Sequence, residues 1–133
     1  MEIAATVNSS ASGRHVLVRT GASSQSLPVP GKADGRGFGI NGGEFLMLAL
    51  ATCYCNDLYR EAHRLGIPLD SVQVEAFAEF PGVGLAATNI RYRANIQSAA
   101  SEADIALLLR TTDAVAEVHN TVRAGVAVQL VPG

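Results

Sequence analysis

The sequence predicts an α+β fold built on antiparallel strands. Two observations carry this prediction. Apolar and polar residues alternate along two neighbouring stretches, residues 72–80 and 90–97, and a long apolar segment of helical length covers residues 44–65. Because strands and helices do not alternate one for one along the chain, α+β is favoured over a doubly wound parallel sheet. A length of 133 residues predicts a single domain, residues 1–133.

The N-terminal part predicts a pair of antiparallel strands. Residues 3–7 alternate between apolar and other side chains, and residues 15–19 read as a returning strand after a turn at residues 9–13. The glycine- and serine-rich segment 20–43 predicts an ordered loop that is long enough to be functional. One short strand is expected in it, near residues 26–29.

A long helix over residues 44–65 is the strongest local prediction. Gly66 suits the position after a helix end, and Pro68 prevents the helix from continuing. The first half of the segment is apolar on almost every side, which predicts a central, buried helix. The second half carries Asp57, Arg60, Glu61, His63 and Arg64 and must reach solvent.

A hairpin follows this helix. Its two strands, residues 72–80 and 90–97, each place apolar residues on one face, as a sheet covered on one side requires. The alternate positions of the second strand hold Arg91 and Arg93, which are expected on its polar face. The connecting Pro-Gly segment predicts the turn.

The C-terminal part predicts a second helix and a last strand. Ser101 can cap the helix, with Asp104 three residues later, and the apolar spacing ends near Ala116. The alternation of Val126, Val128 and Leu130 then predicts a closing strand over residues 126–130.

Composition narrows the classes of function. Hydrophobic residues make up 48% and charged residues 17% of the chain, and this low charge favours an oligomer that covers apolar surface. A net charge of −2 without a basic stripe argues against nucleic acid as a partner. The uncharged run 45–56 is about half as long as a membrane span, and no signal peptide is apparent, so a cytoplasmic protein with no membrane contact is expected.

Cys53 and Cys55 are the only cysteines, and both are expected to be reduced. Cys53 lies where the apolar half of the helix gives way to the polar half, so it is either a small buried apolar residue or a protected nucleophile whose thiolate an arginine stabilises. Cys55 faces a more apolar side, and burial is the expected reading. A metal site from these two cysteines and His119 fits no usual zinc spacing, and none is predicted.

For two further residues, His119 and Glu44, the sequence allows either a structural or a functional role. His119 is either a base or hydrogen-bond partner for Cys53, or a polar residue near a helix end. Glu44 begins the long helix, where the helix dipole favours a carboxylate, and it could also orient an arginine at the thiol.

The segment around Cys53 resembles the OsmC-like family, which includes the organic hydroperoxide resistance proteins. Members typically carry Glu-Leu-Leu-Leu-x-Ala-Leu-Gly-x-Cys at the start of a long buried helix. The comparable stretch here runs from Glu44 to Cys53, with five identities in register: Glu44, Leu46, Ala49, Leu50 and Cys53. The helix exit at residues 65–72 and the last strand at residues 126–130 also look like those of the family.

This resemblance implies an intertwined homodimer in which two antiparallel sheets, with strands from both chains, enclose the long helices. It places Cys53 at the peroxidatic position and His119 where a resolving cysteine normally lies, so that cysteine is absent. Glu44 is one residue away from the glutamate position of the well-defined peroxidases. The family's arginine comes from the N-terminal part across the dimer, with Arg36, Arg14 and Arg19 as the candidates.

The expected function is therefore reduction of organic hydroperoxides by Cys53, tuned by Glu44, His119 and Arg36. With no resolving cysteine, an external thiol would have to be the reductant, and no cofactor or metal is expected. The alternative is a non-catalytic dimer whose cavity binds a small hydrophobic or acidic ligand, with Cys53 merely lining it. A purely structural dimer without a pocket is disfavoured by the glycine-rich loop before the helix.

Overall fold

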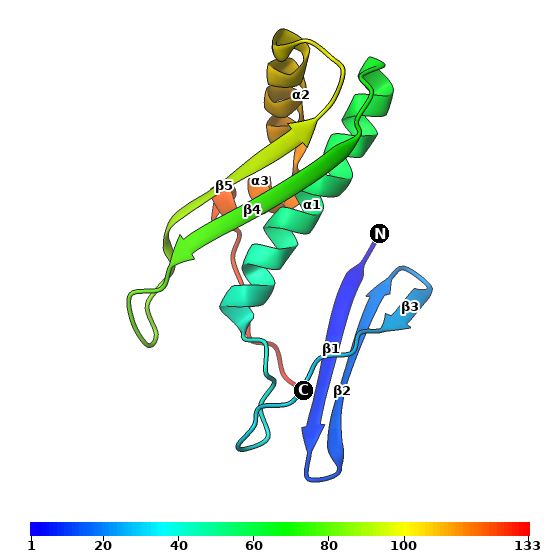
Figure 1. Cartoon of the computed structure of the whole chain (residues 1–133). Coiled ribbons are helices and arrows are strands. Elements are labelled where there is room, and N and C mark those ends of the chain that lie inside the picture. Colours follow the sequence, from blue (N-terminus) through cyan, green and yellow to red (C-terminus); the bar gives the residue numbers. More distant parts are fainter. The chain divides into compact units, whose positions relative to one another are not determined.

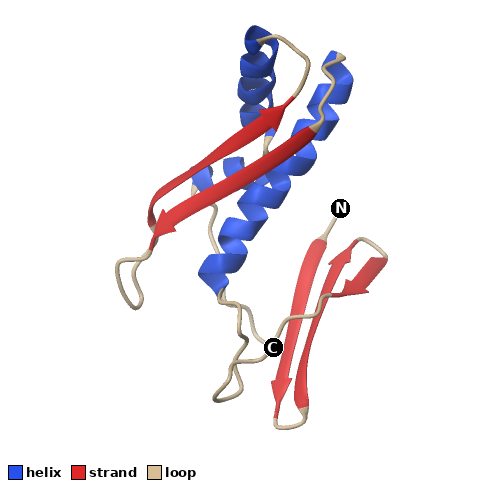
Figure 2. Cartoon of the chain, viewed as in Figure 1, coloured by secondary structure: helices blue, strands red, loops and turns tan.

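The computed structural model describes residues 1–133 and confirms an α+β chain with antiparallel sheets. The chain divides into two compact units, Met1–Phe45 and Leu46–Gly133. Figures 1 and 2 show that each unit contains its own antiparallel sheet. None of the helices combines the length and the apolar character that crossing a membrane requires.

The N-terminal unit is a three-stranded antiparallel sheet of β1 (Ile3–Ser10), β2 (Gly13–Thr20) and β3 (Ser23–Ser26), in that order. The two predicted strands are confirmed, and both are longer than predicted. The third strand lies three residues earlier than predicted. The reason is a tight turn at Gly21, whose φ of 56° lets the chain reverse almost immediately after β2.

The glycine-rich segment after β3 is held by backbone hydrogen bonds rather than by regular structure. Gly31 forms an isolated antiparallel bridge with Phe38, and the N–H of Gly39 donates to the carbonyl of Pro30 at 2.7 Å. The side chain of Arg14 on β2 donates to the carbonyls of Gly35 and Arg36 at 2.5 and 2.9 Å. These bonds confirm the prediction of an ordered loop.

The long helix is α1 (Gly42–Leu65). Its C-terminus closes as the sequence predicts, because Gly66 takes a φ of 69° and its N–H donates to the carbonyl of His63. The N–H of Ile67 donates to the carbonyl of Ala62 at 2.9 Å, which completes a Schellman motif.

The burial of α1 differs from the prediction of a buried first half and a solvated second half. Most of its buried residues lie in the second half, including two carboxylates, Asp57 and Glu61, that are only 5% and 6% exposed. Arg60 and Arg64 explain this result, because these half-exposed side chains pair with the buried carboxylates from the same helix. In the apolar first half, Leu48 is exposed, since nothing within its own unit covers it.

The predicted hairpin is confirmed as β4 (Ser71–Glu79) and β5 (Thr88–Gln97). Val72 pairs with Ile96 and Val74 with Ala94, so the apolar residues share one face. Near the turn the register shifts by a bulge between Phe77 and Glu79, and Phe80 falls beyond the strand into solvent instead of continuing the apolar face.

The hairpin runs across α1 and α2 (Glu102–Val115), as Figure 1 shows. Its apolar face packs on a core formed by five buried residues: Tyr54, Leu58, Ala62, Leu108 and Ala116. Ser101 caps α2 as predicted, with its hydroxyl accepting from the N–H of Asp104 at 3.1 Å.

A third helix, α3 (Glu117–Ala124), is absent from the sequence prediction. Buried Ala116 takes an extended conformation, which ends α2 one residue before the predicted position and lets the chain turn into a new helix. No side chain caps α3 at its start, so the sequence lacks the usual signal of a helix N-terminus.

The predicted closing strand at residues 126–130 is wrong for the single chain. The segment has no regular structure, and Val128 and Leu130 are 98% and 102% exposed. The alternation is present in the sequence, but the segment pairs with no strand of its own unit.

Candidate thiol site

Cys53 lies between two carboxylates. Asp57, one helical turn further along α1, has its Oδ2 at 3.6 Å from the Cys53 Sγ. Glu117, the first residue of α3, has its Oε2 at 4.0 Å from the same sulfur. The thiol is half-buried, Asp57 is buried and Glu117 is exposed, so the cluster reaches from the core to the surface.

The arginine nearest to this cluster is Arg60, and it contacts the carboxylates instead of the thiol. Its Nη1 lies 2.8 Å from Oδ1 of Asp57 and 3.8 Å from Oε1 of Glu117. The two carboxylates therefore stand between guanidinium and sulfur. An arginine-stabilised thiolate, as the sequence predicts, is not formed by Arg60 within one chain.

These surroundings hold the Cys53 thiol in its protonated form. Burial raises its pKa most, and the charges of Asp57 and Glu117 raise it further, whereas a backbone hydrogen bond from Val118 lowers it. Burial also raises the pKa of Asp57, with Arg60 opposing that effect. Thiol and carboxylate therefore compete for one proton, and the carboxylate is placed to accept it when the thiol reacts.

Replacing the charge at Asp57 is expected to make the thiol more reactive. In Asp57→Asn, the loss of a neighbouring negative charge lowers the Cys53 pKa. When a thiol pKa falls by one unit, the fraction of thiolate at neutral pH rises about tenfold. Each thiolate is then about threefold less nucleophilic, because its basicity is lower. Alkylation of Cys53 by iodoacetamide at pH 7.5 should accordingly become faster by about threefold per unit. Intact-protein mass in a Cys55→Ser background measures this rate.

Asp70→Asn, which removes the same charge at the surface, is the control. An unchanged or slower rate in Asp57→Asn would contradict the claim that Asp57 raises the pKa of the Cys53 thiol.

The same three residues could present ligands to a metal, because one atom from each of Cys53, Asp57 and Glu117 lies within 4.8 Å of the others. Arg60 already supplies the positive charge that the two carboxylates need. We therefore assign no metal to this cluster. The set weighed from the sequence, which combined both cysteines with His119, is not the one that the fold brings together.

His119 is buried, at 3% exposure, but it is not hydrogen-bonded to Cys53. Its ring packs against Tyr92 at 4.4 Å and Tyr54 at 5.6 Å between centroids, and neither ring nitrogen has a hydrogen-bond partner. Burial lowers its pKa, so the ring is neutral at pH 7. Its role as a base for the thiol stays a prediction.

Glu44 has a clear structural role in a capping box. The N–H of Glu44 donates to Oδ1 of Asn41 at 2.8 Å, and the Glu44 carboxylate accepts from the N–H of Asn41 at 3.0 Å. Nine residues of ideal helix separate it from Cys53, which is a rotation of about 180° to the opposite face. Along α1, Glu44 therefore faces away from Cys53, and its role at the site stays a prediction.

The three candidate arginines belong to the N-terminal unit. Arg14 is bound by the loop carbonyls described above, and Arg19 pairs with Glu2 at 2.6 Å. The side chain of Arg36 makes no hydrogen bond within this unit, whereas its carbonyl accepts from Arg14. Among the three arginines, Arg36 is therefore the one whose side chain makes no hydrogen bond or ion pair. Its place at the thiol stays a prediction.

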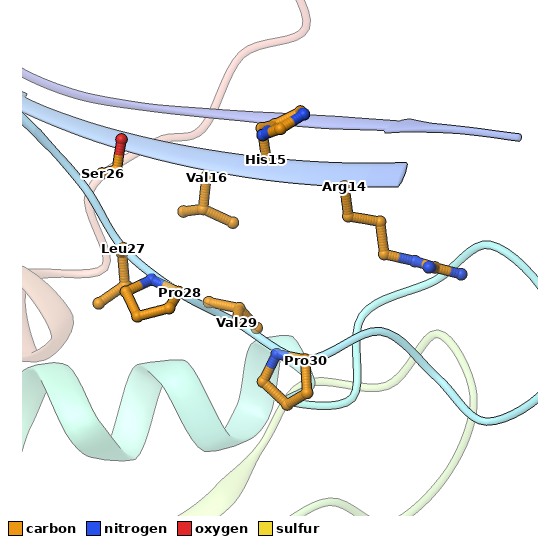
Figure 3. Close-up of a pocket in the computed structure, with 8 residues that line it drawn as sticks. All are labelled: Arg14, His15, Val16, Ser26, Leu27, Pro28, Val29 and Pro30. Carbon is orange, nitrogen blue, oxygen red and sulfur yellow. The ribbon is translucent and has the colours of Figure 1, made fainter. Parts of the chain in front are cut away.

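The N-terminal unit also holds a hollow of about 440 Å³, between β2 and the extended segment 27–30. Figure 3 shows Val16, Leu27 and Val29 along it, with Arg14 extending away at one end toward the neighbouring loop. Because Arg14 is held by backbone carbonyls there, its guanidinium is not free to bind a ligand in this hollow.

A family model described as OsmC-like protein matches residues 32–131. The chain belongs to this family. The matched residues include the whole thiol cluster, whereas the three strands β1, β2 and β3 lie before them. A comparison with curated protein sequences gives no significant match.

Solved structures of OsmC-like proteins share this fold. An OsmC-like protein from Mycoplasma pneumoniae superposes with a TM-score of 0.68 at 18% identity, covering 92% of this chain and 88% of its own. An organic hydroperoxide resistance protein OsmC from Legionella pneumophila gives 0.60 at 16% identity, covering 92% and 90%. An organic hydroperoxide resistance protein from Elizabethkingia anophelis, with thiocyanate bound, gives 0.62 at 17% identity, covering 92% and 89%.

Within this OsmC-like chain, sequence reasoning identified Cys53 but not the two carboxylates as parts of the site. Asp57 was visible as the residue one turn after Cys53, and that i, i+4 spacing was the available signal. Glu117 is 64 residues away in sequence, and only the packing of α3 brings it to the sulfur. Cys55, for which the sequence favours burial, is free and half-buried.

Proposed function

We propose that this OsmC-like protein reduces organic hydroperoxides at Cys53 and takes its electrons from an external thiol. The observation that carries the proposal is the half-buried Cys53 thiol with a proton acceptor, Asp57, at 3.6 Å. Family membership supports it, and two of the similar solved structures are organic hydroperoxide resistance proteins.

The proposed step balances with one proton held at Asp57. Cys53 transfers its proton to the Asp57 carboxylate, and the thiolate attacks the outer oxygen of the hydroperoxide. The S–O bond forms, the O–O bond breaks, and the departing alkoxide takes the proton from Asp57. The products are an alcohol and a Cys53 sulfenic acid.

The sulfenic acid would then be reduced by an external thiol, because the resemblance aligns His119, not a cysteine, with the family's second cysteine. A first thiol displaces water and forms a mixed disulfide with Cys53, and a second thiol releases Cys53 and leaves as a disulfide. A reducing cytoplasm supplies such thiols, which is consistent with the proposed location.

We further propose that the working form is a homodimer. Exposed Leu48 on α1 and the exposed alternating residues Val126, Val128 and Leu130 need a partner that one chain lacks. A second copy would pair with the 126–130 segment and cover these side chains. The predicted Arg36 and Glu44 would then come to Cys53 from the second copy.

The dimer is expected to have about twice the 13.8 kDa mass of one chain in sedimentation equilibrium. Val128→Asp should weaken it by introducing a charge into the covered face, whereas Gln129→Asp, at the alternate position, should not. A monomer mass at every concentration for the unmodified protein would contradict the proposal.

The test of the activity is consumption of cumene hydroperoxide by the protein with dithiothreitol as reductant. We expect faster turnover with this apolar hydroperoxide than with hydrogen peroxide, because the first half of α1, which leads to Cys53, is apolar. The alternative function, a non-catalytic dimer that binds a small hydrophobic or acidic ligand, predicts consumption no faster than dithiothreitol alone.

A further inference from the structure

The charged cluster around Cys53 has more carboxylates than guanidinium groups. Three carboxylates share two guanidinium groups there: Asp57, Glu61 and Glu117 with Arg60 and Arg64. Arg64 pairs with Glu61 at 2.9 Å. The guanidinium of Arg60 lies 2.8 Å from Asp57 but 3.8 Å from Glu117. With every group ionised, the cluster keeps one negative charge in excess.

This excess charge lies at Glu117, the carboxylate that Arg60 holds least closely. The side chain of Glu117 is 70% exposed, whereas Asp57 and Glu61 are buried. The Glu117 Oε2 is also only 4.0 Å from the Cys53 Sγ. That distance is shorter than the screening length of about 8 Å at physiological salt. A charged molecule that approaches this sulfur from solvent therefore interacts with the Glu117 carboxylate.

The molecule that must approach Cys53 after its oxidation is the external thiol. Its thiolate attacks the Cys53 sulfur, an S–S bond forms, and the S–O bond of the sulfenic acid breaks. The departing hydroxide takes up the proton that the thiol released, which gives water. A second thiolate then attacks the reductant's sulfur in the mixed disulfide, and Cys53 leaves as a thiolate and is protonated. Because each attacking sulfur is already negative, any further charge on the reductant decides how strongly Glu117 repels it.

We propose that Glu117 selects the external reductant by charge, favouring thiols with a cationic group near the sulfur and disfavouring anionic thiols. The thiolate of an aminothiol has no net charge, that of a hydroxythiol has one negative charge, and that of a mercapto acid has two. The inference rests on the proposed function, because Cys53 needs a reductant only if it passes through an oxidised state. Arg36 and Glu44, which the proposed dimer would bring to the site, have opposite charges and leave the excess unchanged.

Thiol exchange at a preformed Cys53 disulfide tests this selection without any hydroperoxide. In full-length Cys55→Ser protein, Cys53 is converted to its 2-thiopyridyl disulfide, and the release of pyridine-2-thione is followed by absorbance at pH 7.5. Cysteamine, 2-mercaptoethanol and 3-mercaptopropionate are compared at equal thiolate concentration. Two unit charges several ångströms apart in water change a rate by about threefold. Glu117→Gln should therefore accelerate 3-mercaptopropionate about tenfold and 2-mercaptoethanol about threefold, and leave cysteamine nearly unchanged.

Glu102→Gln is the matched control, because Glu102 is the exposed first residue of α2, as Glu117 is of α3. It should leave all three rates unchanged. Raising the salt from about 0.01 M to about 1 M shortens the screening length from about 30 Å to about 3 Å, so it should have the same effect as Glu117→Gln.

The inference is overturned if the ratios among the three rates are the same with and without the Glu117 carboxylate, or if salt does not change them. Because the exchange uses no hydroperoxide, its result is independent of the peroxidase assay. A protein that selects thiols by charge but consumes no cumene hydroperoxide would refute the proposed function and not the role of Glu117 in this exchange.

Discussion

Cys53→Ser is expected to abolish thiol-dependent reduction of cumene hydroperoxide, whereas Cys55→Ser should retain most of it. A serine hydroxyl is a far weaker nucleophile than a thiol at neutral pH, and it forms no sulfenic acid. Cys55 is the matched control, since it is the only other cysteine and lies on the same helix, also half-buried. Steady-state consumption of the hydroperoxide with excess dithiothreitol measures both variants.

The two variants also distinguish a one-cysteine from a two-cysteine mechanism. If Cys55 reduced the sulfenic acid of Cys53 by forming a disulfide with it, the Cys55→Ser protein would lose turnover. Its Cys53 would remain in a mixed disulfide or become over-oxidised. Residues two apart on a helix point in different directions, and both thiols are free in the structure. Equal loss of activity in both variants would therefore refute the role of an external thiol in the first reduction step.

Leu108→Ala is expected to lower the free energy of unfolding by about 3 kcal/mol, the usual size for a core leucine. Leu108 on α2 is 0% exposed and belongs to the buried core between the hairpin and α1. The substitution leaves a cavity in that core, and alanine has no lower helix propensity that could explain the loss.

Leu107→Ala provides the matched control, because Leu107 is the neighbouring residue of the same helix and is 42% exposed. Its loss should be about 0.5 kcal/mol or less. Urea unfolding followed by circular dichroism measures both variants, at one protein concentration so that any association affects them equally. Similar losses in the two variants would mean that the face of α2 against the core is assigned wrongly.

Much of this fold is readable in the sequence where local patterns agree with the packing. The alternation in β4 and β5 shows which residues share the apolar face, and Gly66 marks the end of α1. These signals are local, because each depends on residues within a few positions of one another. The capping of α2 by Ser101 is predictable for the same reason.

The failures have a common cause in contacts that the sequence does not display. The segment 126–130 alternates like a strand but has no pairing partner in its own unit, and the alternation alone does not show which strand would pair with it. The start of α3 lacks a capping residue, and its position is set by the burial of Ala116. Buried Asp57 and Glu61 look like solvated residues until their arginine partners are known.

The thiol site divides in the same way. The spacing of four residues from Cys53 is the available sequence signal for Asp57, whereas Glu117 requires the tertiary packing of α3 on α1. The ring of His119 packs against two tyrosines, and its role as a base for the thiol stays a prediction. A histidine's partners depend on elements distant in sequence, so no spacing rule could have assigned them.

The central claim is that Cys53 is a nucleophile toward organic hydroperoxides. The most direct test is the rate at which a small excess of cumene hydroperoxide oxidises the reduced protein, followed by intact-protein mass with a sulfenic acid trap. The account predicts fast addition of one oxygen at Cys53, absent in Cys53→Ser and retained in Cys55→Ser. Oxidation of Cys53 no faster than that of an ordinary exposed thiol would contradict it.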